Sequence, residues 1–210
     1  MEEVDDVPCL FSDQRSIAEI QEKIPKMFQI AELESSRAGK IGMEVGSVRE
    51  KMIIAFFIYK FHESNVNANI PITESEIDVI VRGKPYSIKT ISKDSGIKAV
   101  WTVDARSATT FIKNYKPKCD IILVRINWGS EGGVYLIPLK IQEETLQKLG
   151  RNNYLRMPKL GTNPRGVEFS KEAIKAMLSN TKTLKIPIRW KKESLPFNVY
   201  ERWVEYWANV

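Results

Sequence analysis

The feature that most constrains the fold is a pair of short segments on either side of Gly83-Lys84. Residues 76–82 (EIDVIVR) and 85–91 (PYSIKTI) have the period of two that is typical of β-strands, and the Gly-Lys dipeptide predicts a two-residue turn between them. With this turn, Arg82 faces Pro85. The sequence therefore predicts a β-hairpin in the middle of a chain whose first part is helical.

The hairpin is expected to have one polar and one apolar face, because side chains alternate along a strand. In the predicted register Ile80 faces Ser87 and Asp78 faces Lys89, and these four side chains share a face, which Glu76 extends. The other face is expected to enter the core, and its side chains are Val79, Val81, Tyr86 and Ile88. A carboxylate and an ammonium group are therefore predicted to lie side by side.

Two helices are predicted before the hairpin. The spacing of apolar residues indicates the first over 14–35, which Pro25 is expected to kink or break. Its apolar positions are Ile17, Ile20, Ile24, Phe28 and Ala31, and Ser12 or Asp13 is the expected cap. A glycine-rich loop is predicted over 36–46.

The second helix is predicted over 47–62, with Ser47 and Glu50 as a capping box. Its expected buried stripe consists of Val48, Met52, Ala55, Phe56 and Tyr59. After the hairpin the pattern predicts helices over 104–115, 141–149, 168–178 and 198–207, and strands over 119–127, 134–139 and 184–190. The expected fold class is α/β, with a mixed central sheet flanked by helices in one domain over 1–210.

Composition narrows the function. The net charge is +6, but residues 1–35 hold nine acids and three bases, whereas residues 140–192 hold thirteen bases and four acids. A basic half favours a polyanionic partner, although a solvated lysine-rich surface would give the same count. The two cysteines, Cys9 and Cys119, are too few for a disulfide framework, and no apolar run is long enough to span a membrane. We therefore expect a cytoplasmic protein. The five tryptophans are expected in the core.

The Asp78–Lys89 pair has two interpretations. It can be a structural ion pair across the hairpin, which is common in sheets. Alternatively, Asp78 binds a divalent metal through oxygen and Lys89 acts where water attacks a phosphodiester. A metal site of this kind needs a second carboxylate, for which Glu50 is the first choice and Glu76 the second.

Asp78 followed by Ser87-Ile88-Lys89 resembles the signature of the PD-(D/E)XK nucleases, with Ser87 in place of the usual acid. Glu50 is similar to the additional helical glutamate of many such nucleases. Residues 97–104, 115–120 and 161–167 resemble segments of type II restriction endonucleases. The resemblance runs from about residue 36 to the C-terminus.

The resemblance implies a restriction-endonuclease-like core over 36–140, preceded by the acidic helical segment 1–35 and followed by a basic DNA-binding part over 141–210. It implies Mg²⁺ as cofactor, held by Asp78, Glu50 or Glu76 and by the peptide carbonyl of Ile88. It also implies a homodimer that cuts double-stranded DNA at a short palindrome, such as CGCG.

The basic loop over 150–167 is the predicted DNA-reading segment, although it could also be a solvated loop. Arg165 and Asn163 are the expected base contacts. The other residues expected to bind DNA are Arg151, Asn152, Arg156 and Lys159 in this loop and Lys93, Lys98 and Arg106 as phosphate contacts. Met43, in a glycine-framed loop, is either a wedge between base steps or a hydrophobic staple on the following helix.

The expected function is therefore a type II restriction endonuclease. Two alternatives stay open at this point. One is a DNA-binding protein without catalysis, which Ser87 in place of an acid would favour. The other is a structure-specific nuclease or resolvase of the same superfamily, which would give no sequence-defined fragments.

Overall fold

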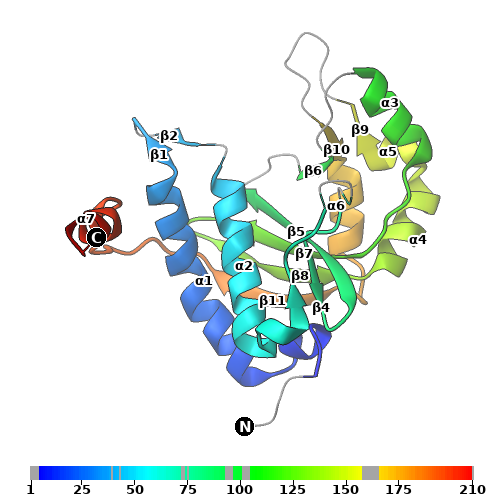
Figure 1. Cartoon of the computed structure of the whole chain (residues 1–210). Helices are drawn as coiled ribbons and strands as arrows, with labels where there is room; N and C mark the ends of the chain where they lie inside the picture. Colours follow the sequence, from blue (N-terminus) through cyan, green and yellow to red (C-terminus); the bar gives the residue numbers. More distant parts are fainter. Residues whose placement is uncertain are drawn as a thin grey trace.

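The computed structural model describes residues 5–38, 40–42, 44–71, 74, 76–92, 97–100, 105–157 and 166–209. A six-stranded mixed sheet forms its centre, in the order β11-β8-β7-β5-β4-β3 (Figure 1). Its strands are β3 (Val66–Asn67), β4 (Val79–Val81), β5 (Lys84–Ser92), β7 (Asp120–Ile126), β8 (Glu131–Ile137) and β11 (Leu184–Arg189). Only β5 and β7 pair in parallel, and the other neighbours are antiparallel. The predicted α/β class with a mixed central sheet is confirmed.

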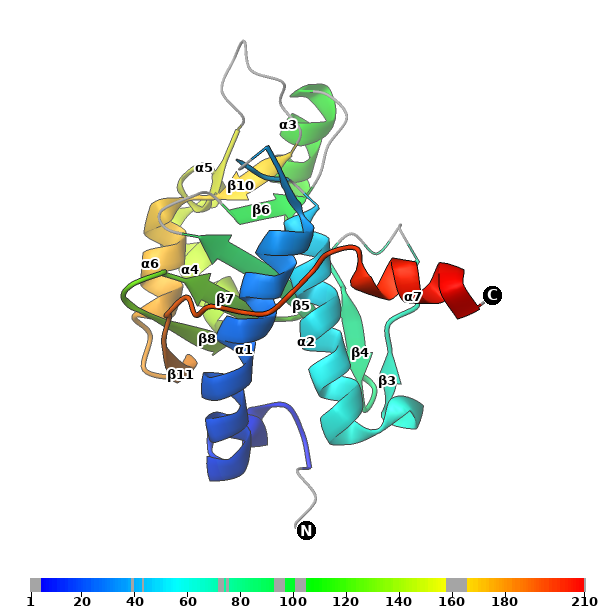
Figure 2. The same ribbon diagram turned by 90° about the vertical axis from the view of Figure 1, so that its left-hand side faces the viewer.

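Helices α1 (Gln14–Glu34) and α2 (Val45–Phe61) lie side by side on one face of the sheet (Figure 2). The 3-10 helices η1 (Pro8–Phe11) and η2 (Glu63–Asn65) adjoin them, and the two-residue strands β1 (Ser36–Arg37) and β2 (Lys40–Ile41) pair between them. Phe28, Phe57 and Trp190 are among the buried side chains of this first core. The outward side chains of α2 therefore remain on the surface.

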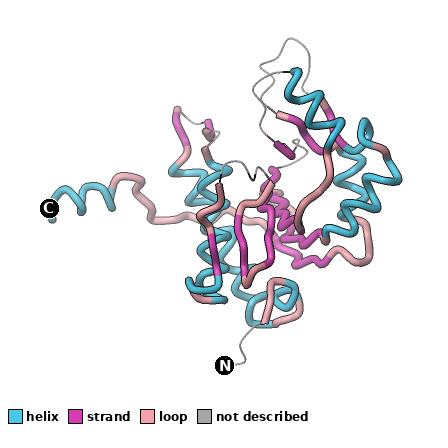
Figure 3. The backbone as a smooth tube through the Cα atoms, turned by 45° about the vertical axis from the view of Figure 1, so that its right-hand side comes forward, coloured by secondary structure: helices cyan, strands magenta, loops and turns pink. Residues whose placement is uncertain are grey.

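A second core fills the opposite face of the sheet, and Figure 3 shows helices on both sides. Its helices are α3 (Ala105–Asn114), α4 (Leu139–Leu149), α5 (Arg151–Tyr154) and α6 (Lys171–Leu178). A small three-stranded sheet lies beside these helices, in the order β6-β10-β9. Its strands are β6 (Ile97–Val100), β10 (Val167–Phe169) and β9 (Leu155–Arg156). The last element, α7 (Glu201–Asn209), lies apart from both cores. None of the described helices is long and apolar enough to cross a membrane.

The hairpin forms with its turn one residue earlier than predicted. Arg82 and Gly83 are the two turn residues, with φ of 48° and 79°. Positive φ at both central positions is the geometry whose twist matches that of a two-stranded ribbon. Ile80 consequently faces Pro85 instead of Ser87. The register moves by two residues, so every side chain keeps the face that the alternation predicted.

The first helix is confirmed over almost its whole predicted length. The Asp13 carboxylate caps it by accepting a hydrogen bond from the peptide N–H of Ser16 at 2.8 Å. The expected break at Pro25 is wrong, since α1 is one helix of 21 residues. Pro25 itself is buried beside Ile24 and Phe28, and the packing of this face offsets the hydrogen bond that proline cannot make.

The second helix begins earlier than predicted and buries a different stripe. Glu44 is its N-cap and no side chain caps it, so the predicted capping box of Ser47 and Glu50 is wrong. The buried positions are Arg49, Ile53, Phe57 and Phe61, whereas Ala55 and Tyr59 of the predicted stripe are exposed. Apolar residues surround this helix on most sides, so their spacing does not identify the buried face.

Four further expectations are corrected. The loop predicted over 36–46 contains the pair of short strands β1 and β2, and the loop over 150–167 contains α5 and β9. The glycines at 132 and 133 lie within β8, where a Cβ on Gly132 would approach the carbonyl oxygen of Arg125 to 2.1 Å. Trp190 is fully buried as expected, but Trp203 and Trp207 are exposed.

Candidate active site at the Asp78–Lys89 hairpin

The site is centred on the carboxylate of Asp78, immediately before β4. Its Oδ2 accepts hydrogen bonds from the peptide N–H of Ile88 at 2.6 Å, the hydroxyl of Ser87 at 3.0 Å and the ammonium of Lys89 at 3.0 Å. Every hydrogen bond that the described residues give to this carboxylate reaches Oδ2. Asp78 and Lys89 are therefore in contact, as predicted. They are diagonal neighbours across the hairpin instead of a directly opposed pair.

Ser87 supports the carboxylate. Its side chain is buried, and its hydroxyl donates a hydrogen bond to Asp78. This hydrogen bond gives the serine a role at a position where related signatures carry an acid. The N–H of Ile88 points toward Asp78, and the carbonyl of a strand residue points to the same side as its N–H. The Ile88 carbonyl is therefore directed to the edge where Asp78 lies, beyond the last pair of the β4–β5 ladder.

Glu50 approaches this hairpin from the first turns of α2. Burial raises the pKa of its carboxyl, the negative charge of Asp78 raises it further, and Lys89 and Lys51 act in the opposite direction. A divalent cation between the two carboxylates would offset the effect that the Asp78 charge has on Glu50. Carboxylate oxygens together with a peptide carbonyl are the donor set that hard divalent cations prefer, so these residues fit such an ion. The described residues contain no group of three or more acidic, histidine or cysteine side chains suited to a metal.

Glu76 has a different environment. It lies in the turn before β4 and is buried, and burial raises the pKa of its carboxyl to about 7. The positive charges of Lys118 and Lys89 oppose that shift. Its carbonyl accepts from the thiol of Cys119, whose pKa burial raises to about 12. Between the two glutamates, Glu50 is the one whose pKa responds to the charge of Asp78.

A buried ion pair fixes the start of α2, and the sequence analysis missed it. The guanidinium of Arg49 donates to Glu32 Oε1 at 2.7 Å, and each side chain is 5% exposed. Trp128 Nε1 donates to the same oxygen at 2.7 Å, and Lys192 Nζ lies 2.9 Å from Oε2. Arg49 also reaches the hydroxyl of Ser92 at the end of β5 at 3.4 Å. The residue next to Glu50 is therefore anchored to α1 and to the end of β5.

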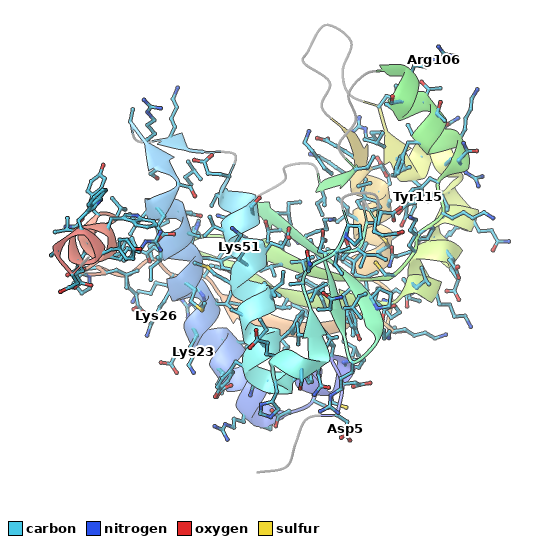
Figure 4. All side chains as sticks on the ribbon, in the orientation of Figure 1. Asp5, Lys23, Lys26, Lys51, Arg106 and Tyr115 are labelled. Atoms are coloured by element: carbon cyan, nitrogen blue, oxygen red, sulfur yellow. The ribbon has the colours of Figure 1, made fainter. Side chains whose placement is uncertain are left out.

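The predicted DNA-contacting residues that can be placed lie on the small sheet and its helices. Arg151 and Asn152 are on α5, Arg156 is on β9 and Lys98 is on β6. Arg106 is at the outer end of α3, where Figure 4 labels it. All are exposed except Lys98, which is half-buried. The remaining predicted contacts lie outside the described residues, and these are Met43, Lys93, Lys159, Asn163 and Arg165.

Comparison with known proteins identifies the family. The family model described as restriction endonuclease ThaI matches residues 10–209. One solved structure, described as a restriction endonuclease in complex with substrate DNA, is 50% identical and gives a TM-score of 0.90. The alignment covers 98% of this chain and 100% of that chain. A search of curated proteins gave no match.

These matches decide between the alternatives left open by the sequence. They favour a restriction endonuclease over a non-catalytic DNA-binding protein and over a structure-specific nuclease. They confirm the resemblance to type II restriction endonucleases, with ThaI as the enzyme that the chain resembles. The chain belongs to the ThaI restriction endonuclease family and is a type II site-specific deoxyribonuclease.

Proposed function

We propose that the protein is a homodimer that hydrolyses duplex DNA in a Mg²⁺-dependent reaction at a short palindrome, with CGCG as the site to test first. The observation that carries this proposal is the distance of 3.0 Å between the Asp78 carboxylate and the Lys89 ammonium, beside Glu50. The structural neighbour that is bound to substrate DNA supports DNA as the partner. A two-fold symmetric protein matches the symmetry of a palindromic site.

In this proposal Asp78 and Glu50 bind the divalent ion, with the carbonyl of Ile88 as a further oxygen ligand. The bound ion would polarise the scissile phosphate and lower the pKa of a water molecule. Lys89 holds its ammonium at the same carboxylate, so it is placed to stabilise negative charge that develops on the phosphate during attack. Ser87 and the Ile88 N–H keep the Asp78 carboxylate in one orientation.

The placed basic residues suit phosphate contacts in this proposal. Arg106, Arg151 and Arg156 are exposed on the elements around the small sheet. Because such contacts release counterions, we expect DNA affinity to fall steeply with salt. We also propose that residues 1–210 act as one domain in the cytoplasm, in keeping with the free thiols of Cys9 and Cys119.

Asp78→Asn tests the proposal, because it removes the charge and keeps the size of the side chain. We expect it to abolish cleavage of plasmid DNA in Mg²⁺ and to leave sequence-specific binding measurable in Ca²⁺. Glu131→Gln is the matched control, since it removes an exposed carboxylate whose ion-pair partner within the described part of the chain is Lys185 at 2.8 Å. Digestion of DNA of known sequence, with and without EDTA, reports the site and the metal dependence together. Cleavage by Asp78→Asn at the wild-type rate would contradict the assignment.

A further inference from the structure

The C-terminal helix α7 stands away from the rest of the molecule and carries large aromatic side chains. Figures 1 and 3 show it at the end of an extended segment, outside the layers of helices and sheet. None of its residues is buried. Trp203 is 55% exposed and Trp207 is 84% exposed, and Tyr200, Val204 and Tyr206 are also exposed. A contiguous exposed aromatic surface of this kind is typical of an interaction site.

The segment before α7 is fixed to α1, which sets where the helix begins. The side chain of Gln29 exchanges two hydrogen bonds with the backbone of Glu193, at 2.6 and 2.9 Å. Further along, Arg202 pairs with Glu34 at 3.1 Å, at the C-terminal end of α1. These contacts carry α7 to one end of α1 and leave its aromatic side chains without a packing surface on their own chain.

A second unfilled apolar surface lies between α1 and α2. It is a groove of about 220 Å³, and its outward side chains include Met27 on α1 and Met52, Ala55, Phe56 and Tyr59 on α2. Tyr59 is 56% exposed, its hydroxyl donates to Glu19 at 3.3 Å, and the Lys23 ammonium lies 5.8 Å from its ring centroid. Methionine and aromatic side chains together form a surface that adapts well to an inserted aromatic ring.

The charges around the two surfaces are complementary. The helix α7 carries Glu201 and Glu205 one turn apart, and neither has an ion-pair partner among the described residues. Lys23 and Glu19 line the groove, and the charge of Glu19 is offset by Lys60 at 2.7 Å. Two further lysines, Lys26 on α1 and Lys51 on α2, lie on the helices that form the groove (Figure 4). An acidic aromatic helix is poorly suited to DNA or to an anionic membrane, because like charges repel. It suits a groove edged by lysines.

We infer that α7 of one copy packs into the α1–α2 groove of a second copy, and that the second copy returns the same contact. Each chain carries both the helix and the groove. When two copies exchange their helices, both surfaces of each copy are buried and the dimer has two-fold symmetry. The inference rests on the homodimer of the proposed function and adds the segment and the groove that form it. It places the interface on the face of α1 and α2 that points away from the sheet.

Solution mass tests the exchange in the absence of DNA. We expect the full chain to have twice its mass of 24.1 kDa, and Trp203→Ala with Trp207→Ala to weaken dimerisation. Buried tryptophans are frequent hot spots, so each truncation should raise the dimer dissociation constant by about 30-fold. Ala55→Glu, at an exposed position of the groove, should also weaken the dimer. Ala55→Ser and Trp207→Phe are the matched controls and should remain dimeric.

A disulfide experiment identifies which surfaces meet. In a Cys9→Ser background, protein with Ala55→Cys is mixed with protein carrying Trp207→Cys and oxidised. The exchange predicts a covalent dimer in the mixture and little in either protein alone. A dimer from Trp207→Cys alone would indicate helix-to-helix contact. In a chain that carries both Ala55→Cys and Trp207→Cys, a link that forms only within the chain would indicate that α7 packs on its own groove. Either result overturns the inference.

Cleavage assays separate this inference from the proposed function. If the α7 and groove variants stay dimeric while DNA is cut at a defined site, the inference is wrong and the function stands. If the wild-type chain is monomeric at micromolar concentration, the inference is also wrong. If the mass and disulfide results are as expected but no DNA is cut, the exchange stands and the proposed function fails.

Discussion

Two ion pairs adjoin Glu50, one on the hairpin and one between α1 and α2, and they differ in burial and in their partners. Lys89 and Asp78 are 3.0 Å apart, with side chains 18% and 17% exposed. Arg49 and Glu32 are 2.7 Å apart, and each is only 5% exposed. The first pair is open to a ligand from solvent. The second is closed by Trp128 and supplemented by Lys192.

The difference shows how one segment combines function with support. A buried pair is costly to break, because the remaining charge has no water to solvate it. A partly exposed pair can exchange one partner for a cation or a phosphate at a small cost. Arg49 and Glu50 are adjacent in the sequence, so the sealed pair holds the helix while the next residue serves the open site.

The largest expected effect is on stability, at the sealed pair. Arg49→Met leaves the Glu32 carboxylate buried without its main partner, and we expect a loss of about 3–5 kcal/mol in the free energy of unfolding. Adding Glu32→Leu should recover part of that loss, because both charges are then absent. Urea unfolding of the two variants measures the effect. Equal stability of Arg49→Met and the wild type would mean that the buried pair is no more costly to break than the partly exposed one.

At the open pair the expected effect is on the rate. In the proposed reaction Lys89→Ala removes the positive charge that would stabilise the phosphate, and we expect single-turnover cleavage to slow by about 100- to 1000-fold. The free energy of unfolding should change little, since the side chain is partly exposed. Lys140→Ala, at an exposed lysine on α4, is the control. A large loss of stability without a loss of cleavage rate would mean that the Asp78–Lys89 pair is structural and has no role in the reaction.

Ser87 provides a finer test of the open site. Its hydroxyl donates to Asp78 at 3.0 Å, so Ser87→Ala removes a positioning group without removing a ligand. We expect the affinity for Mg²⁺ to fall by about 10- to 100-fold, with a near-normal rate at saturating metal. Ser130→Ala, at an exposed loop position, should change neither quantity. A slower rate at saturating metal would assign Ser87 a direct role in the reaction.

The smallest effect concerns the pH dependence of stability. Burial and Asp78 raise the pKa of Glu50 above its usual value, so the folded protein binds that proton more readily than the unfolded chain. The ionised carboxylate therefore reduces stability above its folded pKa, and the reduction vanishes below the unfolded pKa. Glu50→Gln should be more stable than the wild type at pH 8 and equally stable at pH 4. Greater stability of the variant at both values would contradict this cause.

The hairpin shows how much a sequence pattern can predict. The turn was misplaced by one residue, yet Asp78, Ser87 and Lys89 came together because a shift of two in register preserves side-chain alternation. The first helix was predicted for a similar reason, since its apolar stripe is clear on one side. Local periodicity is sufficient to predict which side chains are buried when only one face of a helix or strand is apolar.

Features that depend on distant partners could not be predicted in this way. Arg49 is buried because Glu32, seventeen positions away, receives it, and no local pattern encodes that pairing. On α2 the apolar residues are too numerous to identify the buried face. Tryptophan at positions 203 and 207 was expected in the core because aromatic residues usually are, but the chain offers these two no cover.

The adjacency of Arg49 and Glu50 limits how this enzyme can be re-engineered. Successive residues of an α-helix point about 100° apart, so the anchored arginine dictates the direction of the glutamate after it. Inserting one residue between them would turn the acid away from the hairpin, even if the helix itself formed normally. Libraries that aim at a new cleavage sequence should therefore allow no insertion or deletion at the start of α2. They should vary the basic residues of the predicted DNA-reading segment 150–167 instead.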